Sequence, residues 1–269
     1  KVVSPVFDFK VQKGNTVAGE FDENVKVAIA VDMWGINDSR KVTACVFDEK
    51  AGKWKRIGGA LDGRTGFVTF ETPHFSKYAA VEGKAVFNDV KSPWSKNEIE
   101  VLASRGLING KSKTVFDPSS DITRAEFTAL VVRSLYTETG QHEGVFDDVN
   151  DGSWYADAVE TAYRLGLVNG SADKSFSPEE KITREQIVTI LHRLYSYKKG
   201  EAGSADSMAF DDAAEISDYA LKAVEFASEK GIAKGSGNSF YPQRNATREE
   251  AAVLIFRALE VMGELPSSE

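Results

Sequence analysis

Cysteine, histidine and long apolar runs are scarce in this 269-residue chain, and each scarcity excludes a kind of site. The single cysteine, Cys45, excludes an internal disulfide, and its place in the alternating segment VTACVF predicts a buried thiol. The histidines, His74, His142 and His192, are far apart and lack the spacing of metal ligands. No segment approaches the roughly 20 apolar residues that span a bilayer, and none resembles a signal peptide. We therefore expect no metal, no other cofactor and no membrane span.

Clustered positive charge is also lacking. The net charge is −8, and no group of Lys and Arg forms a stripe for phosphates, which argues against nucleic acid as a partner. An anion would therefore have to be recognised by local groups. With 42% hydrophobic residues, the chain is long enough for the core of one large domain or of two ordinary ones.

Residues 1–82 have the pattern of a small β module. Short β-branched or aromatic segments alternate with a period of two, and turn sequences at 48–53 and 62–66 separate some of them. The segments are VFDFKV, VKVAIAV, KVTACVF, WKRIGGAL, GFVTFE and KYAAVE. They predict an antiparallel sandwich or barrel without a catalytic constellation. Trp34 and Trp54 could bind sugar, but tryptophans in so small a domain are more often core residues, and we expect them in the core.

From Phe87 onward the periodicity becomes helical, and a unit of about 60 residues occurs three times. Each unit has an aspartate, an aromatic that opens a first helix, a glycine twelve residues later that ends it, a second glycine, Phe-x-Pro and Thr-Arg. The aspartates are Asp89, Asp148 and Asp212, and the aromatics are Trp94, Trp154 and Tyr219. The glycines are Gly106, Gly166 and Gly231, then Gly110, Gly170 and Gly235.

The three Thr-Arg motifs begin second helices. Threonine is the N-cap, and the acid or amide three residues later completes a capping box, which stabilises by about 1 kcal/mol. Arginine follows in the first turn, where the helix dipole disfavours a cation by about 0.3–1 kcal/mol. The motifs are ITRAE at 122–126, ITREQ at 182–186 and ATREE at 246–250, with Arg124, Arg184 and Arg248. An arginine at this unfavourable position in all three repeats predicts a functional role for the arginines. The structural alternative is that each arginine pairs with a carboxylate such as Asp121 or points into water.

One unit cannot bury its apolar face alone, and three units are about the minimum that can. We therefore expect a closed, all-α pseudo-threefold domain in which the second helices form a central three-helix bundle. Adjacent repeats would form grooves between them. In each groove, free helix N–H groups, an arginine, a glycine loop and an aromatic would suit an acidic saccharide.

These units resemble S-layer homology (SLH) repeats, whose signature combines Phe-x-Asp-Val, a Trp-Ala helix, Gly-Leu-Ile-x-Gly, Phe-x-Pro and Ile-Thr-Arg-Ala-Glu. The resemblance covers about residues 84–262, with repeats at 83–143, 144–205 and 206–269. It implies a secreted, non-enzymatic module at the cell wall or S-layer that anchors exported proteins noncovalently. The implied partner is a secondary cell-wall polysaccharide ending in pyruvylated N-acetylmannosamine, beside S-layer neighbours.

The resemblance also implies a set of ligand-binding residues. The arginines would bind the ketal carboxylate, the aromatics the sugar face, and the aspartates and loops the hydroxyls. The set is Asp89, Trp94, Gly110, Ser112, Arg124, Asp148, Trp154, Gly170, Ser171, Arg184, Asp212, Tyr219, Gly235, Ser236 and Arg248. Repeat 3 departs from the pattern at Tyr219, at Ala246 and at Lys234, so we expect unequal grooves and favour those that the first two motifs serve.

Other functions are also compatible with the sequence. The segment DVNDG at 148–152 would suit a calcium loop, although it lacks the alternating ligands and the final Glu of an EF-hand. Many carboxylates would allow a glycoside hydrolase, but sequence alone cannot pair two of them across a cleft. The leading alternative is a protein-interaction or self-assembly scaffold of the cell surface. The β module would be a spacer, a sugar-binding module or the end of a larger assembly unit.

Overall fold

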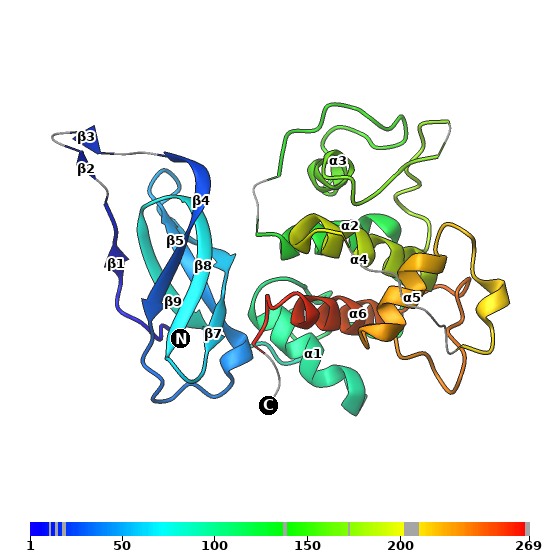
Figure 1. The fold of residues 1–269 in the computed structure, drawn as a ribbon, viewed down its shortest axis with the longest axis horizontal. Coiled ribbons are helices and arrows are strands. Elements are labelled where there is room, and N and C mark those ends of the chain that lie inside the picture. Colours follow the sequence, from blue (N-terminus) through cyan, green and yellow to red (C-terminus); the bar gives the residue numbers. More distant parts are fainter. Residues whose placement is uncertain are drawn as a thin grey trace.

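The computed structural model describes residues 1–10, 12–13, 16–17, 20–136, 139–171, 173–201 and 210–266. A β region formed by the first part of the chain lies beside a helical region formed by the rest (Figure 1). The strands are β1 Phe7–Asp8, β2 Gln12–Lys13, β3 Thr16–Val17, β4 Glu20–Ala30, β5 Val42–Asp48, β6 Lys53–Gly58, β7 Ala60–Asp62, β8 Phe67–His74 and β9 Lys77–Glu82.

The β region contains two main sheets that share one core. A four-stranded sheet has the order β1-β9-β5-β6, a three-stranded sheet has the order β4-β8-β7, and β2 and β3 form a separate hairpin. All pairings are antiparallel. Side chains of both sheets meet in the core, among them Ile29, Val42, Phe70 and Tyr78. An N-terminal β region is thus present as the alternating segments predict, and the hairpin turns lie where expected.

The two tryptophans of the β region are not in its core, so that prediction is wrong. Trp34 lies in the loop after β4 and is 91% exposed. Trp54 is 45% exposed and packs against Phe47 of the neighbouring strand, with ring centroids 5.3 Å apart. Tyr78 and Phe70 fill the core instead. The prediction for Cys45 is confirmed, because the thiol is buried and burial raises its pKa to about 11.

In the described part of the chain after the β region there are six α-helices, two for each sequence repeat. They are α1 Pro93–Ser104, α2 Arg124–Ser134, α3 Ala156–Arg164, α4 Arg184–Lys199, α5 Leu221–Glu229 and α6 Arg248–Val261. The predicted capping boxes are confirmed at the start of α2, α4 and α6. The first helices end as predicted, since Gly106, Gly166 and Gly231 have φ of 78°, 69° and 68°, which suits glycine beyond a helix end.

The predicted all-α, pseudo-threefold domain around a central three-helix bundle is wrong. Each motif threonine pairs in an antiparallel bridge with a residue just before another repeat's motif, so this region is not purely helical. The bridges are Asp121 with Thr247, Thr123 with Lys181 and Thr183 with Asn245. The most extensive helix contacts are α1 with α6, α2 with α3 and α4 with α5. Contacts between second helices are fewer: α4 with α6 is intermediate, and α2 with α4 is smaller still. The physical reason is that each second helix buries its apolar face mainly against a first helix from another repeat.

A buried arginine joins the two regions. Arg105, at the end of α1, is 1% exposed and donates hydrogen bonds to backbone carbonyls of Arg40 (3.2 Å), Val42 and Gly59 (2.6 Å) in the β region. Around it, the Arg40 guanidinium donates to the Asn97 side chain of α1 at 2.9 Å. The β region is thereby fixed against the first repeat.

The predicted repeat boundaries near residues 82 and 143 fall between elements and remain predictions, whereas the boundary at 205/206 lies outside the described residues. In the part of the chain that the structure describes, no helix has both the length and the apolar character needed to cross a membrane. Nor do the described side chains include a group of three or more His, Cys, Asp or Glu that could hold a metal ion.

Candidate functional site

Each motif arginine reaches into the loop of another repeat. Its Nε donates to the carbonyl of the Phe-x-Pro phenylalanine, and its guanidinium lies over the ring of the same residue. The pairs are Arg124 with Phe176 (hydrogen bond 3.0 Å, ring 4.9 Å), Arg184 with Phe240 (2.7 Å, 5.1 Å) and Arg248 with Phe116 (3.1 Å, 4.8 Å). These contacts are internal, so the arginines have a structural role that the sequence did not reveal. Each guanidinium makes a further internal hydrogen bond, Arg124 to Asn169 O (3.4 Å), Arg184 to Glu250 (3.3 Å) and Arg248 to Asn109 O (3.0 Å), so only the donors left over could bind a ligand.

The helix N–H groups that the sequence offered to a ligand are already bonded, so that part of the groove prediction is wrong. At the start of α2, the N–H of Arg124 donates to Glu180 O at 2.9 Å and the N–H of Ala125 donates to Pro178 O at 3.0 Å. The third N–H, of Glu126, donates to the Thr123 cap. The starts of α4 and α6 are bonded in the same way. These N–H groups are therefore not free to bind a ligand.

The repeat aspartates hold the Phe-x-Pro turns. The Asp148 carboxylate accepts the N–H groups of Phe176 and Ser177, both at 2.7 Å. Asp89 and Asp212 bind the equivalent turns. The residue after each phenylalanine has positive φ, a conformation that costs about 1–3 kcal/mol outside glycine and so needs support; these residues are Asp117 (63°), Ser177 (59°) and Tyr241 (58°). For Asp89, burial raises the pKa, but the hydrogen bonds from the turn outweigh it and the pKa is lowered.

These carboxylates aim the carbonyls that the arginines bind, which gives a first testable prediction. Asp148→Ala should leave two turn N–H groups unpaired and lower the free energy of unfolding by about 1–3 kcal/mol. Thermal unfolding followed by circular dichroism measures this loss. A variant that melts like the parent chain while losing sugar affinity would contradict the structural role and favour direct contact with sugar hydroxyls.

The second glycine of each repeat is required by close packing. A Cβ atom at Gly110 would lie 2.5 Å from the Phe87 ring, and one at Gly170 would lie 2.3 Å from the Phe146 ring. At Gly235 the nearest atom would be the carbonyl of Ser239, at 2.6 Å. The loop serines mainly serve their own turns: the Ser112 hydroxyl accepts backbone N–H groups, the Ser171 hydroxyl donates within its loop, and Ser236 pairs with Ser239 through the backbone.

One groove brings together groups from all three repeats. It has a volume of about 170 Å³ and combines the Arg248 guanidinium of repeat 3, the loop around Gly110 of repeat 1 and Trp154 of repeat 2. Its lining is Ile108, Asn109, Gly110, Lys111, Ile122, Glu126, Leu130, Arg133, Trp154 and Arg248. Trp154 is 61% exposed, so its ring is available to a sugar face. We call this the Arg248 groove.

The equivalent groups around Arg124 come from the same three repeats, and we call this set of groups the Arg124 groove. The Arg124 guanidinium of repeat 1 donates to Asn169 O in the loop of repeat 2 at 3.4 Å. Tyr219 of repeat 3 takes the place of the tryptophan and is 56% exposed. Its hydroxyl donates to Glu185 at 2.7 Å, and burial together with this carboxylate raises the pKa of Tyr219, while positive charge on Arg124 and Arg193 opposes the rise. The phenol therefore stays protonated near two arginines.

The third position, the Arg184 site, has the most neutralised arginine. Arg184 is 6% exposed, and its Nη1 lies 3.3 Å from Glu250 Oε1. The same carboxylate also binds Arg244. Trp94, the aromatic of repeat 1, is 47% exposed on α1, which packs against α6. The sequence predicted ligand sets in grooves between adjacent repeats, and at the Arg248 groove the set comes from all three repeats.

Sequence reasoning missed a second row of arginines. Arg133 lines the Arg248 groove, and burial lowers its pKa. Arg193 and Arg257 are its equivalents, and burial lowers their pKa values as well. Each lies nine residues after a motif arginine, on the same helix. This constant spacing was the signal that could have identified them.

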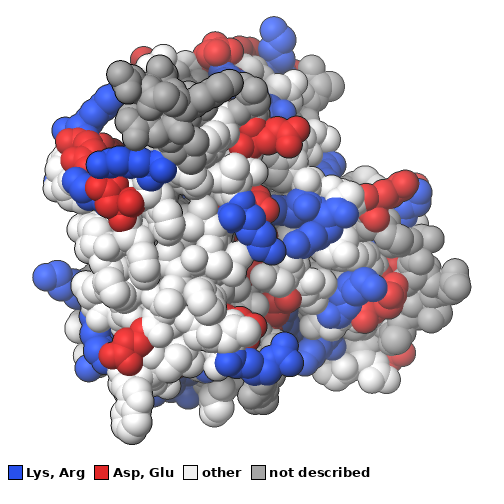
Figure 2. Space-filling view, turned by 60° about the vertical axis from the view of Figure 1, so that its left-hand side comes forward, with Lys and Arg blue, Asp and Glu red and all other residues white. Residues whose placement is uncertain are grey.

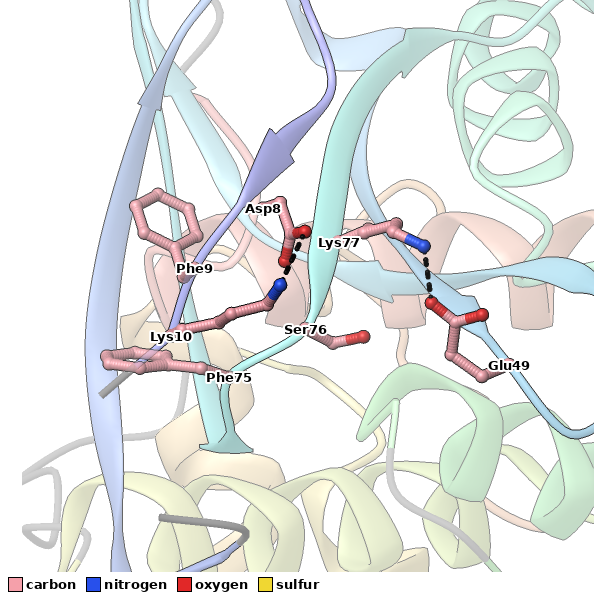
Figure 3. Close-up of a pocket in the computed structure, with 7 residues that line it drawn as sticks. All are labelled: Asp8, Phe9, Lys10, Glu49, Phe75, Ser76 and Lys77. Atoms are coloured by element: carbon pink, nitrogen blue, oxygen red, sulfur yellow. Dashed lines mark hydrogen bonds and ion pairs between the residues drawn. The ribbon is translucent and has the colours of Figure 1, made fainter. Parts of the chain in front are cut away.

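On the face shown in Figure 2, the described residues give no sign of another anion site. Figure 2 shows one face on which blue and red groups are interspersed, without a continuous basic band. A depression of about 250 Å³ in the β region contains two ion pairs, Lys10 with Asp8 at 3.3 Å and Lys77 with Glu49 at 2.7 Å (Figure 3). Phe9 and Phe75 form its apolar side. None of the residues predicted to bind ligand lies there.

Comparison with known proteins identifies the repeats. The family described as S-layer homology domain matches residues 86–128, 145–188 and 209–252. An amylopullulanase of Thermoanaerobacterium thermosulfurigenes is 39% identical over 89% of this chain, which spans 13% of that protein. Exoglucanase XynX of Acetivibrio thermocellus is 37% identical over 75% of the chain, which spans 20% of the enzyme. The surface-layer 125 kDa protein of Lysinibacillus sphaericus is 27% identical over 71% of the chain and 16% of its own length.

Proposed function

Through its three repeats this chain belongs to the S-layer homology family, and on that basis we propose that it anchors an exported protein noncovalently to the bacterial cell wall. The family and the surface-layer relative place the chain at the cell surface or cell wall. Similar segments occur both in proteins named as enzymes and in proteins named as surface-layer components. Such a distribution suits a holding module, and we propose no catalytic role for this chain.

The proposed ligand is a secondary cell-wall polysaccharide whose terminal N-acetylmannosamine carries a pyruvate ketal. The supporting observation is the Arg248 groove, whose charged lining is two arginines, a lysine and one glutamate, beside an exposed tryptophan. A guanidinium can bind a carboxylate through two parallel hydrogen bonds, and an indole ring can cover the apolar face of a sugar. These are the two parts of a pyruvylated sugar, so one groove suits one terminal residue.

Calorimetric titration with a synthetic pyruvylated N-acetylmannosamine tests the proposal. The sugar without the ketal lacks the carboxylate, so it should bind about 10–100-fold more weakly, since a charge-assisted hydrogen bond contributes roughly 1.5–3 kcal/mol. A short peptide with a free C-terminal carboxylate serves as the third titrant. Equal affinity for both sugars, or tighter binding of the peptide, would contradict the proposal; the second result would favour a scaffold of the cell surface.

A further inference from the structure

We propose that the Arg124 groove is the strongest carboxylate site of the three and that Gln186 makes it so. This inference rests on the proposed function and specifies where the acidic group of the sugar binds. It follows from the residue three positions after each capping threonine, which is Glu126, Gln186 or Glu250. Within its own helix this residue completes the capping box, and the two glutamates also face an arginine of another repeat.

In two repeats this residue is a glutamate whose oxygens divide the two roles. Glu250 Oε2 accepts the Thr247 N–H at 3.0 Å, and its Oε1 lies 3.3 Å from Arg184 Nη1. Glu126 Oε2 likewise accepts the Thr123 N–H at 3.0 Å, while its Oε1 faces Lys111 and Arg248, the latter at 3.8 Å. An internal carboxylate therefore neutralises part of the charge of Arg184 and Arg248.

Burial raises the pKa values of both glutamates, but their hydrogen bonds and cationic neighbours outweigh it. The net effect lowers the pKa of Glu126 and of Glu250, so both are ionised at neutral pH. Each is then a competitor for any external carboxylate that approaches the same guanidinium.

In repeat 2 the equivalent residue is Gln186, whose side chain is a neutral amide and not a negatively charged carboxylate. Its Oε1 accepts the Thr183 N–H at 3.1 Å, so the capping role uses the only acceptor of the amide. The other terminal atom, which is a carboxylate oxygen in Glu126 and Glu250, is here an NH₂ group. Glu250 faces Arg184 and Glu126 faces Arg248, so by equivalence this NH₂ group faces Arg124 and offers N–H donors where the other two positions carry negative charge.

Arg124 accordingly differs from the other motif arginines. Among the described residues it has no carboxylate within ion-pair distance, and its side chain donates to the carbonyls of Phe176 and Asn169. It is also more exposed than Arg184 and Arg248, which are each 6% exposed. Around Arg124, the donors are its own guanidinium and, by equivalence with Glu126 and Glu250, the Gln186 amide; Arg193 and Tyr219 lie nearby, with the Tyr219 hydroxyl bonded to Glu185. Glu180 and Asp148 act on Arg124 only from beyond ion-pair distance, so an external carboxylate would be its first direct ion-pair partner.

The test is Gln186→Glu, which keeps the capping box because glutamate already fills this position in the other repeats. Titration of the whole chain with pyruvylated N-acetylmannosamine should show the tightest site weakened about tenfold or more, because the new carboxylate competes for Arg124. The matched variant Glu250→Gln should strengthen binding at the Arg184 site. Unchanged thermal unfolding of both variants confirms that the fold is kept.

The outcomes separate the two proposals. If the parent chain binds the pyruvylated sugar in preference to the plain sugar but Gln186→Glu binds it equally well, the assignment of the Arg124 groove is overturned and the proposed function stands. If the parent chain does not discriminate between the sugars, the proposed function fails, and the groove assignment fails with it.

Discussion

Replacing Arg124 and Arg248 together by alanine is expected to abolish retention of this chain on isolated cell wall. Each guanidinium contributes a charge-assisted contact of roughly 1.5–3 kcal/mol, so each loss should weaken its own groove by about one to two decades. Because several grooves on one polymer network also add avidity, losing two sites removes more than the sum of the separate affinities. Co-sedimentation with purified wall measures the effect.

Arg184→Ala is the matched control for this experiment. It removes the same internal contacts, a hydrogen bond to a phenylalanine carbonyl and a guanidinium over the ring, so its cost in stability should be similar. Its cost in wall binding should be smaller, since Glu250 already pairs with Arg184. Retention of the double variant at the parent level, or equal losses in all three single variants, would contradict the inequality of the grooves.

The sequence predicted the local parts of the site because they depend on neighbours in the chain. Capping boxes need a threonine and an acid or amide three residues later, and all three are present. The partners of the arginines could not be predicted in this way, since Arg248 and Phe116 are 132 residues apart. For the same reason, the sequence did not show that the Asp148 carboxylate accepts the N–H of Phe176; the family resemblance implied only a role toward sugar hydroxyls, which stays a prediction.

The fold shows the same division between local and long-range information. Alternation of apolar residues was enough to predict the β region. The glycine positions predicted the ends of the first helices, and these glycines have positive φ in the structure. The packing of the helices did not follow, because an apolar face does not specify which partner covers it. Helix α1 packs against α6, from the far end of the chain. The apolar face of α6 is therefore covered mainly by α1 and not by the other second helices.

Arg105→Ala is expected to destabilise the chain more than Asp148→Ala or the loss of any one motif arginine. The carbonyls of Arg40, Val42 and Gly59 would lose this donor; the bond to Val42 is buried and the other two are partly buried, and an unpaired buried group costs about 1–3 kcal/mol. Allowing for relaxation, we expect a loss of at least about 3 kcal/mol, which should lower the melting temperature by roughly 6–12 °C in a chain of this size. Differential scanning calorimetry measures both the shift and the number of transitions.

The calorimetric trace also tests whether Arg105 holds the two regions together. Without it, the β region and the repeats should unfold in separate transitions, because the side chain that spans their junction is gone. Arg64→Ala is the control, since that arginine is 90% exposed and its removal should change the free energy of unfolding by no more than about 0.5 kcal/mol. Below the first transition, Arg105→Ala should still bind wall, since the grooves lie within the repeats. A single, unshifted transition would show that other contacts fix the junction.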